Sequence, residues 1–264
     1  MKTKLCAILI SFALFGCQQK QDGKTYVPRA LTTTEDLNAY PKDKADSLSI
    51  YKYPDADGKS TLFGIKFKDT PVKIQTNKDD QNSGVDKFSF AQFINTQKTT
   101  LLVQIADNSS LPGPFYIVTL KGEDLDVISL YRASKGAGDS KFTKGVDKIG
   151  LTGFLINNDY FVTPVIAKVY PVKRQNEEER IQGLPFVNSP DRQTLVFLVG
   201  SSLYQVHYRT STVFNQPLPA SAPAGPVLFD YVTKNFSWVK NKDGISFLKS
   251  DADDNKIVDM RNFK

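Results

Sequence analysis

The sequence predicts a mainly β protein, an antiparallel β-sandwich or barrel-like meander with short helical turns. Two observations indicate this fold class. Short apolar or alternating segments recur along the chain, and Gly, Asn and Asp residues separate them at positions typical of tight turns. In addition, a chain of 264 residues is long enough to bury roughly 70 to 75% of its unfolded surface, so the fold needs no disulfide to be stable.

Five pairs of segments have the composition of β-hairpins. In chain order, the expected strands and the turns between them are residues 48–53 and 61–67 around Asp57-Gly58; 115–120 and 125–131 around Gly122-Glu123-Asp124; 149–156 and 160–170 around Asn157-Asn158-Asp159; 194–199 and 201–214 around Gly200-Ser201; and 236–239 and 245–248 around Asp243-Gly244. Pro164 cannot donate a ladder hydrogen bond, so it predicts an edge strand or a bulge. Only residues 88–96 and 175–181 are expected to be helical.

The segment 201–214 has the clearest period of two and supplies a candidate binding face. One face carries Tyr204, Val206 and Tyr208, and the other carries Gln205, His207 and Arg209. This pattern is typical of a half-buried strand. We expect the polar face to be solvated, and Gln205, His207 and Arg209 are the candidate ligand-binding residues.

The N-terminus has the features of an export signal. Lys2 and Lys4 precede an apolar run of twelve residues, 5–16, which ends in Leu14-Phe15-Gly16-Cys17. A membrane-spanning helix needs roughly 20 apolar residues, so the run is too short to remain in a bilayer. A basic start, a short apolar run and small residues before a cleavage point are typical of a removable signal. The alternative is a buried N-terminal helix.

This segment resembles a bacterial lipoprotein signal peptide with its lipobox. The resemblance implies that Cys17 carries diacylglycerol, usually with a third acyl chain, and becomes the first residue of the mature protein. Two or three acyl chains hold a protein on a membrane without an amphipathic helix or a basic patch. We therefore expect a cell-envelope protein that a lipid anchors to the outer membrane. In lineages that export lipoproteins to the outer face, the signal resembles an acidic cluster directly after the cysteine. Only Asp22 is acidic here, so the side of the membrane that the protein faces stays open.

The expected domain organisation has five parts. Residues 1–16 form the signal peptide, 17–44 a polar, flexible tether, 45–215 the β domain, 216–226 a Pro-rich crossing segment, and 227–264 a C-terminal hairpin packed on the β domain. The tether is expected because its composition offers too little apolar area to offset the entropy of ordering it. Residues 227–264 are too few to form an independent core, so we expect them to pack on the β domain.

Composition argues against several classes of function. Without the signal peptide and its two lysines, 32 basic and 28 acidic side chains remain, a net charge of +4. These charges alternate along the chain, whereas nucleic-acid binders concentrate them, so we expect no nucleic-acid partner. Cys6 lies in the signal and Cys17 is the lipid site, which leaves the mature chain without a thiol for a disulfide, a metal or a nucleophile.

Candidate chemistry is sparse. His207 is the only histidine, so a catalytic triad or a histidine zinc site would have to use it. A weak calcium candidate is formed by Asp251, Asp253 and Asn255, spaced like the first ligands of an EF-hand loop. Lys256 stands where that loop requires Gly and Asn262 where it requires Glu, so we expect no metal. We predict no cofactor and no catalytic residue.

These observations favour a binding or assembly module over an enzyme, with an envelope protein or a glycan as the possible partner. The alternative is an envelope hydrolase that uses carboxylates, with glycan as its candidate substrate. The sequence leaves the ligand and the oligomeric state open.

Overall fold

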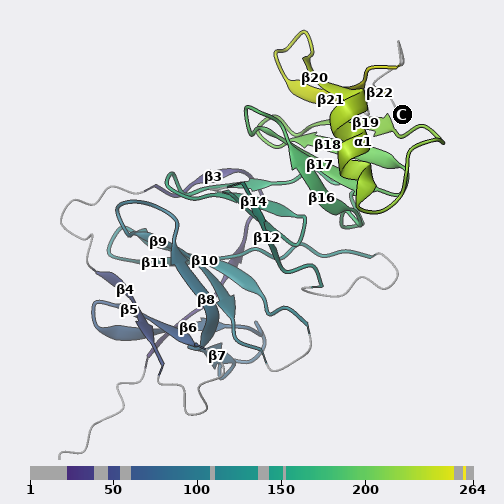
Figure 1. Cartoon of the computed structure of the whole chain (residues 1–264). Helices are drawn as coiled ribbons and strands as arrows, with labels where there is room; N and C mark the ends of the chain where they lie inside the picture. Colours follow the sequence, from purple (N-terminus) through teal and green to yellow (C-terminus); the bar gives the residue numbers. More distant parts are fainter. Residues whose placement is uncertain are drawn as a thin grey trace, which may run out of the picture.

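A computed structural model describes residues 23–38, 47–53, 61–107, 111–135, 143–150, 153–252 and the backbone of 258–259. It is mainly β with one helix, which confirms the predicted fold class. Three large sheets follow one another in chain order from the N-terminal to the C-terminal end (Figure 1). No helix among the described residues is long and apolar enough to cross a membrane.

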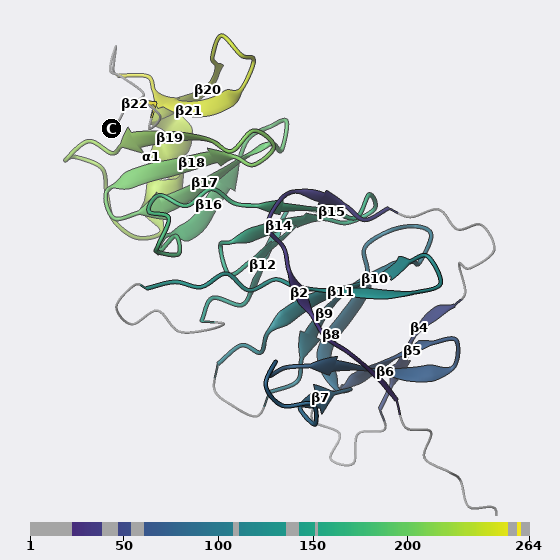
Figure 2. The same ribbon diagram turned by 180° about the vertical axis from the view of Figure 1, so that it is seen from behind.

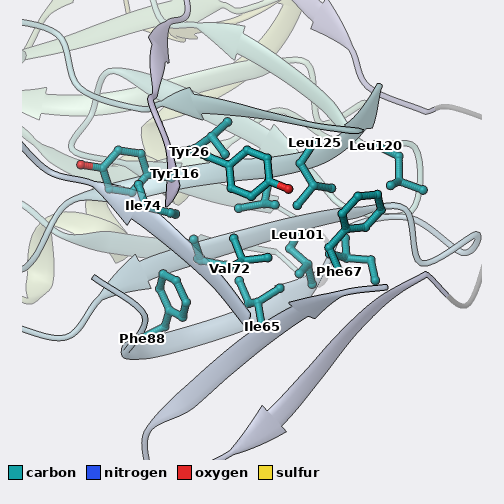
Figure 3. Packing of buried hydrophobic residues seen from close by; sticks show 14 of the residues in the cluster. Tyr26, Ile65, Phe67, Val72, Ile74, Phe88, Leu101, Tyr116, Leu120 and Leu125 are labelled. Atoms are coloured by element: carbon teal, nitrogen blue, oxygen red, sulfur yellow. The ribbon is translucent and has the colours of Figure 1, made fainter. Parts of the chain in front are cut away.

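The first sheet is the largest and curls on itself. Along its main path the strands are β1 (Lys24–Tyr26), β6 (Thr70–Gln75), β5 (Phe63–Phe67), β8 (Phe88–Phe93), β9 (Thr100–Ile105), β10 (Phe115–Lys121), β11 (Asp124–Ser129) and β2 (Arg29–Ala30), while β4 (Leu48–Lys52) pairs with β5 and β7 (Gly84–Val85) with β6. Inside the curl lies an apolar cluster that includes Ile65, Leu101 and Phe88, all fully buried (Figure 3).

The segment 23–38, which we call the strap, joins three parts of the fold. Its β1 pairs in parallel with β6, its β2 pairs in parallel with β11, and its β3 (Glu35–Asp36) pairs with β15 of the second sheet. Because β6 and β11 are at opposite ends of the first sheet, the strap bridges these ends and then continues to the next sheet (Figure 2).

The expected tether is therefore wrong for the strap. Tyr26, Leu31 and Leu37 are each less than a tenth exposed, and residues 24–26, 29–30 and 35–36 pair with strands of the two sheets. These backbone hydrogen bonds and the three buried side chains order the segment although most of its residues are polar. The other tether residues, 17–22 and 39–44, lie outside the described residues.

The second and third sheets are antiparallel meanders. The second contains β12 (Val146–Ile149), β13 (Gly153–Ile156), β14 (Tyr160–Thr163), β15 (Lys168–Pro171) and β3; the third contains β16 (Leu184–Asn188), β17 (Thr194–Val199), β18 (Ser202–His207), β19 (Thr212–Pro217) and β22 (Val258–Asp259).

Apolar clusters between the layers hold the sheets together. One cluster joins the first and second sheets and includes Phe115 and Phe154; another joins the second and third and includes Phe161 and Phe197. The second sheet is thus covered on both faces, and every residue of β13 is buried.

The C-terminal part packs on the third sheet. Helix α1 (Val227–Asn235) buries Leu228 and Val232, which lie in one cluster with Val196 of β17 and Leu203 of β18. The hairpin of β20 (Phe236–Lys240) and β21 (Ser246–Ser250) forms as expected, with its turn at Gly244 in the left-handed region. The helix itself was not predicted.

Three local expectations are wrong. Residues 88–93 form strand β8 and not a helix, because their apolar side chains contribute to two clusters on opposite sides of the sheet. Residues 175–181 form a turn with one isolated bridge between Asn176 and Glu179. Pro164 lies in a turn that separates β14 from β15, where Val165 has a φ of 77°, so it ends a strand and marks neither an edge nor a bulge.

Candidate binding site

A cavity of about 390 Å³ opens at one mouth of the curled first sheet. Its volume lies within the range of roughly 300 to 1,000 Å³ that is usual for small-ligand sites. We call it the mouth cavity. Its described lining residues are Pro28, Arg29 and Ala30 of the strap, Gln75, Thr76, Asn77 and Lys78 at the end of β6, and Tyr116, Ser129 and Tyr131.

Tyr116 and Ser129 form the inner wall of the mouth cavity. They are paired across the β10–β11 ladder, so their side chains lie next to each other on one face of the sheet, and the Tyr116 ring belongs to the apolar cluster inside the curl. Its hydroxyl points away from that cluster (Figure 3), and neither it nor the Ser129 hydroxyl has a hydrogen-bond partner among the described residues. Burial raises the pKa of Tyr116 to about 12, so this hydroxyl keeps its proton at neutral pH and both groups are donors and acceptors.

The turn after β6 forms a second wall with a fixed shape. The Gln75 amide nitrogen donates to the carbonyls of Asn77 and Lys78 at 2.8 and 3.3 Å. Ser83 closes the turn, because its hydroxyl accepts from the Asn77 backbone N–H at 3.0 Å and donates to the Asp80 carbonyl at 2.7 Å. These bonds leave the Gln75 side-chain carbonyl without a described donor.

The strap forms a third wall, and its arginine is already neutralised. Arg29 donates from Nη1 and Nη2 to the two oxygens of Glu35, both at 2.7 Å, and from Nε to Asp126 at 2.9 Å. Hydrogen bonds to Glu35 and then Asp126 raise the pKa of Arg29, so the guanidinium stays charged. Lys78 is the remaining cationic side chain of the lining, and it has no ion-pair partner within the described part of the chain.

The predicted binding face on β18 lies in a different environment. Gln205 is fully buried, and its amide exchanges two hydrogen bonds with the backbone of Leu248 in β21, at 2.7 and 2.8 Å. Arg209 is exposed in the turn after β18. The expectation of a solvated face is wrong, because the C-terminal hairpin covers this side of the third sheet.

His207 is held by neighbouring polar side chains. Its Nδ1 lies 2.7 Å from the Thr210 hydroxyl, and its Nε2 lies 3.3 Å from the Gln193 side-chain oxygen. Burial lowers the pKa of His207, and nearby Arg209 lowers it further while Asp191 opposes this. The neutral imidazole is therefore favoured, and its contacts fix the turn between β18 and β19.

A buried ion cluster holds the chain segment after β15. Asp159 accepts from Arg174 Nε at 2.9 Å and from Arg180 Nε at 3.0 Å, and all three side chains are about 1% exposed. Arg174 also donates to the carbonyls of Arg132 and Ala133. Because these groups are enclosed and bonded to backbone, the cluster is structural.

Two smaller cavities adjoin strand edges. One, of about 290 Å³, lies beside the mouth cavity and includes Glu35 and Asp126. The other, of about 260 Å³, lies between β12 and β16 and includes Asp147, whose carboxyl pKa is raised by burial. Both are below the usual size of a ligand site.

The remaining predicted site residues are mostly not described. Cys17, Asp253 and Asn255 lie outside the described residues, while Asp251 is exposed just after β21. Within the described ranges there is no group of three or more His, Cys, Asp or Glu side chains that would hold a metal. The lipid site and the absence of calcium binding stay predictions.

Sequence reasoning assigned none of the mouth-cavity residues to a site. The cavity combines four segments that are far apart in the chain, and no local motif marks them. Comparison of the chain with protein-family models and with curated proteins gives no match.

Proposed function

We propose that the chain is a binding module of the bacterial cell envelope, anchored through lipid on Cys17 and holding a small polar ligand in the mouth cavity. The carrying observation is the unpartnered Tyr116 and Ser129 hydroxyls on the inner wall of a cavity of ligand size. The Tyr116 side chain is 4% exposed, but its hydroxyl is not one of the described side-chain atoms that are enclosed without a partner. The hydroxyl is therefore accessible from the cavity, where a ligand would supply its hydrogen-bond partner.

A lipid on Cys17 would hold the mouth cavity close to the membrane, because only a short segment separates Cys17 from the strap. Six Cα–Cα steps separate Cys17 from Gly23, and a fully extended chain spans at most about 3.5 Å per step. A lipid attached at Cys17 would therefore lie at most roughly 20 Å along the chain from the start of the strap. Since the strap also lines the mouth cavity, a lipid on Cys17 would keep the ligand site near the membrane surface.

The lining favours binding over hydrolysis by carboxylates. None of the described lining residues is acidic. The nearest carboxylates, Glu35 and Asp126, both bind Arg29 and are not among the described lining residues. A glycosidase needs two carboxyl groups beside the scissile bond, and the described lining of the mouth cavity supplies neither.

A cavity-blocking variant tests the binding role. The mature chain with Cys17→Ser is screened by ligand-observed NMR against a panel of sugars, amino acids, short peptides, nucleosides and inorganic anions. The same panel is applied to a Ser129→Phe variant, whose side chain fills the cavity, after its melting curve shows that it is folded. We expect at least one compound class to bind only the open cavity. If no compound distinguishes the two proteins, the mouth cavity is not a binding site.

A further inference from the structure

We infer that the ligand of the mouth cavity is an uncharged, hydroxyl-rich molecule, namely a terminal sugar or short oligosaccharide. This inference rests on the proposed function and concerns the same site. It follows from three properties of the lining: its unused hydrogen-bonding groups, its ring surfaces and its charge.

The unused polar groups match those of a sugar. Hydroxyls of Tyr116 and Ser129 each donate and accept, the Gln75 carbonyl accepts, and the Asn77 amide nitrogen donates. None of these four atoms has a hydrogen-bond partner among the described residues. Sugar hydroxyls also donate and accept, so they satisfy such a mixed set without leaving either kind of group unpaired.

Ring surfaces stand beside these polar groups. Tyr131 and Pro28 line the same cavity, whereas the Tyr116 ring lies in the apolar cluster and offers only its hydroxyl. Tyrosine combines an apolar face with a polar tip, and the C–H faces of a sugar ring provide the apolar surface that packs on it. Rings and hydroxyls together are therefore more typical of a sugar site than of a site for a small ion.

The charge of the lining disfavours anions. Phosphate and carboxylate sites use arginine forks or rows of backbone N–H groups, whereas the only arginine here is fully engaged with Glu35 and Asp126. One exposed lysine, Lys78, remains at the rim. A single ammonium group is weak compensation for a phosphate, but it donates readily to a hydroxyl.

The strand pairing disfavours a peptide. Peptides that add to a sheet need an open edge with free backbone groups. At this mouth β1 occupies the edge of β6 and β2 the edge of β11. The end strand that lines the cavity, β2, is only two residues long, so its edge is too short to pair with an extended peptide.

The test is an NMR titration of the mature chain with Cys17→Ser. The probes are glucose, galactose, mannose, N-acetylglucosamine and their β-linked disaccharides, with tetra-alanine and inorganic phosphate for the peptide and anion alternatives. We expect a sugar to shift the amide signals of Asn77 and Ser129. Tyr116→Phe and Ser129→Ala should each weaken binding about threefold to tenfold, the equivalent of one hydrogen bond.

A matched control removes a hydroxyl from another tyrosine of the same sheet. Tyr51 of β4 shares a hydrogen bond with the hydroxyl of Tyr53 and does not line the mouth cavity, so Tyr51→Phe should leave sugar affinity unchanged. Binding of tetra-alanine or phosphate in the cavity without any sugar would overturn the sugar inference and leave the binding role intact. Sugar binding that is equal in Tyr116→Phe, Ser129→Ala and wild type would also overturn it. If no compound binds the wild-type cavity better than it binds the Ser129→Phe protein, both proposals are refuted.

Discussion

Removing the Leu31 side chain from the strap should destabilise the whole protein. Leu31 is only 5% exposed and belongs to the apolar cluster between the first and second sheets. If this segment were a flexible tether, the Leu31 side chain would not contribute to the free energy of unfolding. Leu31→Ala therefore tests whether the strap is part of the fold or only links the fold to a membrane.

The expected magnitude follows from burial. Truncation of a buried leucine to alanine costs about 2 to 5 kcal/mol, depending on how far the site collapses. Because Leu31 keeps 5% of its surface exposed and lies in a short segment, we expect the lower part of that range, about 2 to 3 kcal/mol. For a domain of this size such a loss lowers the melting temperature by roughly 4 to 12 °C.

Val27 provides the matched control, because it lies in the same strap but is 63% exposed. Val27→Ala should change the free energy of unfolding by less than about 0.5 kcal/mol. Urea unfolding measures both variants, and the midpoint should fall for Leu31→Ala while the slope stays the same. An unchanged midpoint in Leu31→Ala would refute the reasoning that the strap is packed structure.

Three further predictions concern other parts of the chain. Asp159→Asn should destabilise the fold by about 3 to 5 kcal/mol, because it leaves two buried arginines without their carboxylate; Glu179→Gln, at an exposed position nearby, is the control, and equal urea midpoints would contradict the prediction. His207 should titrate below its ordinary pKa of 6.5, as measured by NMR of this single histidine. Its contribution to the free energy of unfolding should be complete above pH 6.5 and should be lost as the pH falls through the lowered pKa. The variant His207→Gln should lack this pH dependence. Cys17→Ser should abolish incorporation of a labelled fatty acid and release the protein from the membrane fraction, and a mutant that keeps both label and membrane association would contradict the lipobox interpretation.

Local turn chemistry made several hairpins predictable. The turns of β10–β11, β17–β18 and β20–β21 place Gly122, Gly200 and Gly244 at positive φ, between 58° and 75°. Glycine adopts this region without a steric penalty, so the turn positions could be identified from adjacent residues alone. The strands on either side needed only their own apolar pattern.

The strap could not be predicted by the same reasoning. Its buried residues Tyr26, Leu31 and Leu37 are spaced five or six apart, which matches neither the helical nor the strand period. Its three strands are two or three residues long and gain their partners from distant parts of the chain. The information that orders this segment lies in the sheets it joins, not in its own composition.

The β18 face shows why the expected site and the candidate site differ. Alternation correctly placed Gln205 and His207 on one side of a strand, but polarity does not establish exposure when a later segment covers that side. The buried Gln205 amide is satisfied by Leu248 of the covering hairpin, so its polarity serves to fix that hairpin. At the mouth cavity the Tyr116 and Ser129 hydroxyls have no such partner within the described chain. A buried polar group that the protein itself satisfies contributes to the fold, whereas one that faces a cavity without a partner is available to a ligand. By this criterion the mouth of the first sheet, and not the polar face of β18, is the place where ligand binding should be sought.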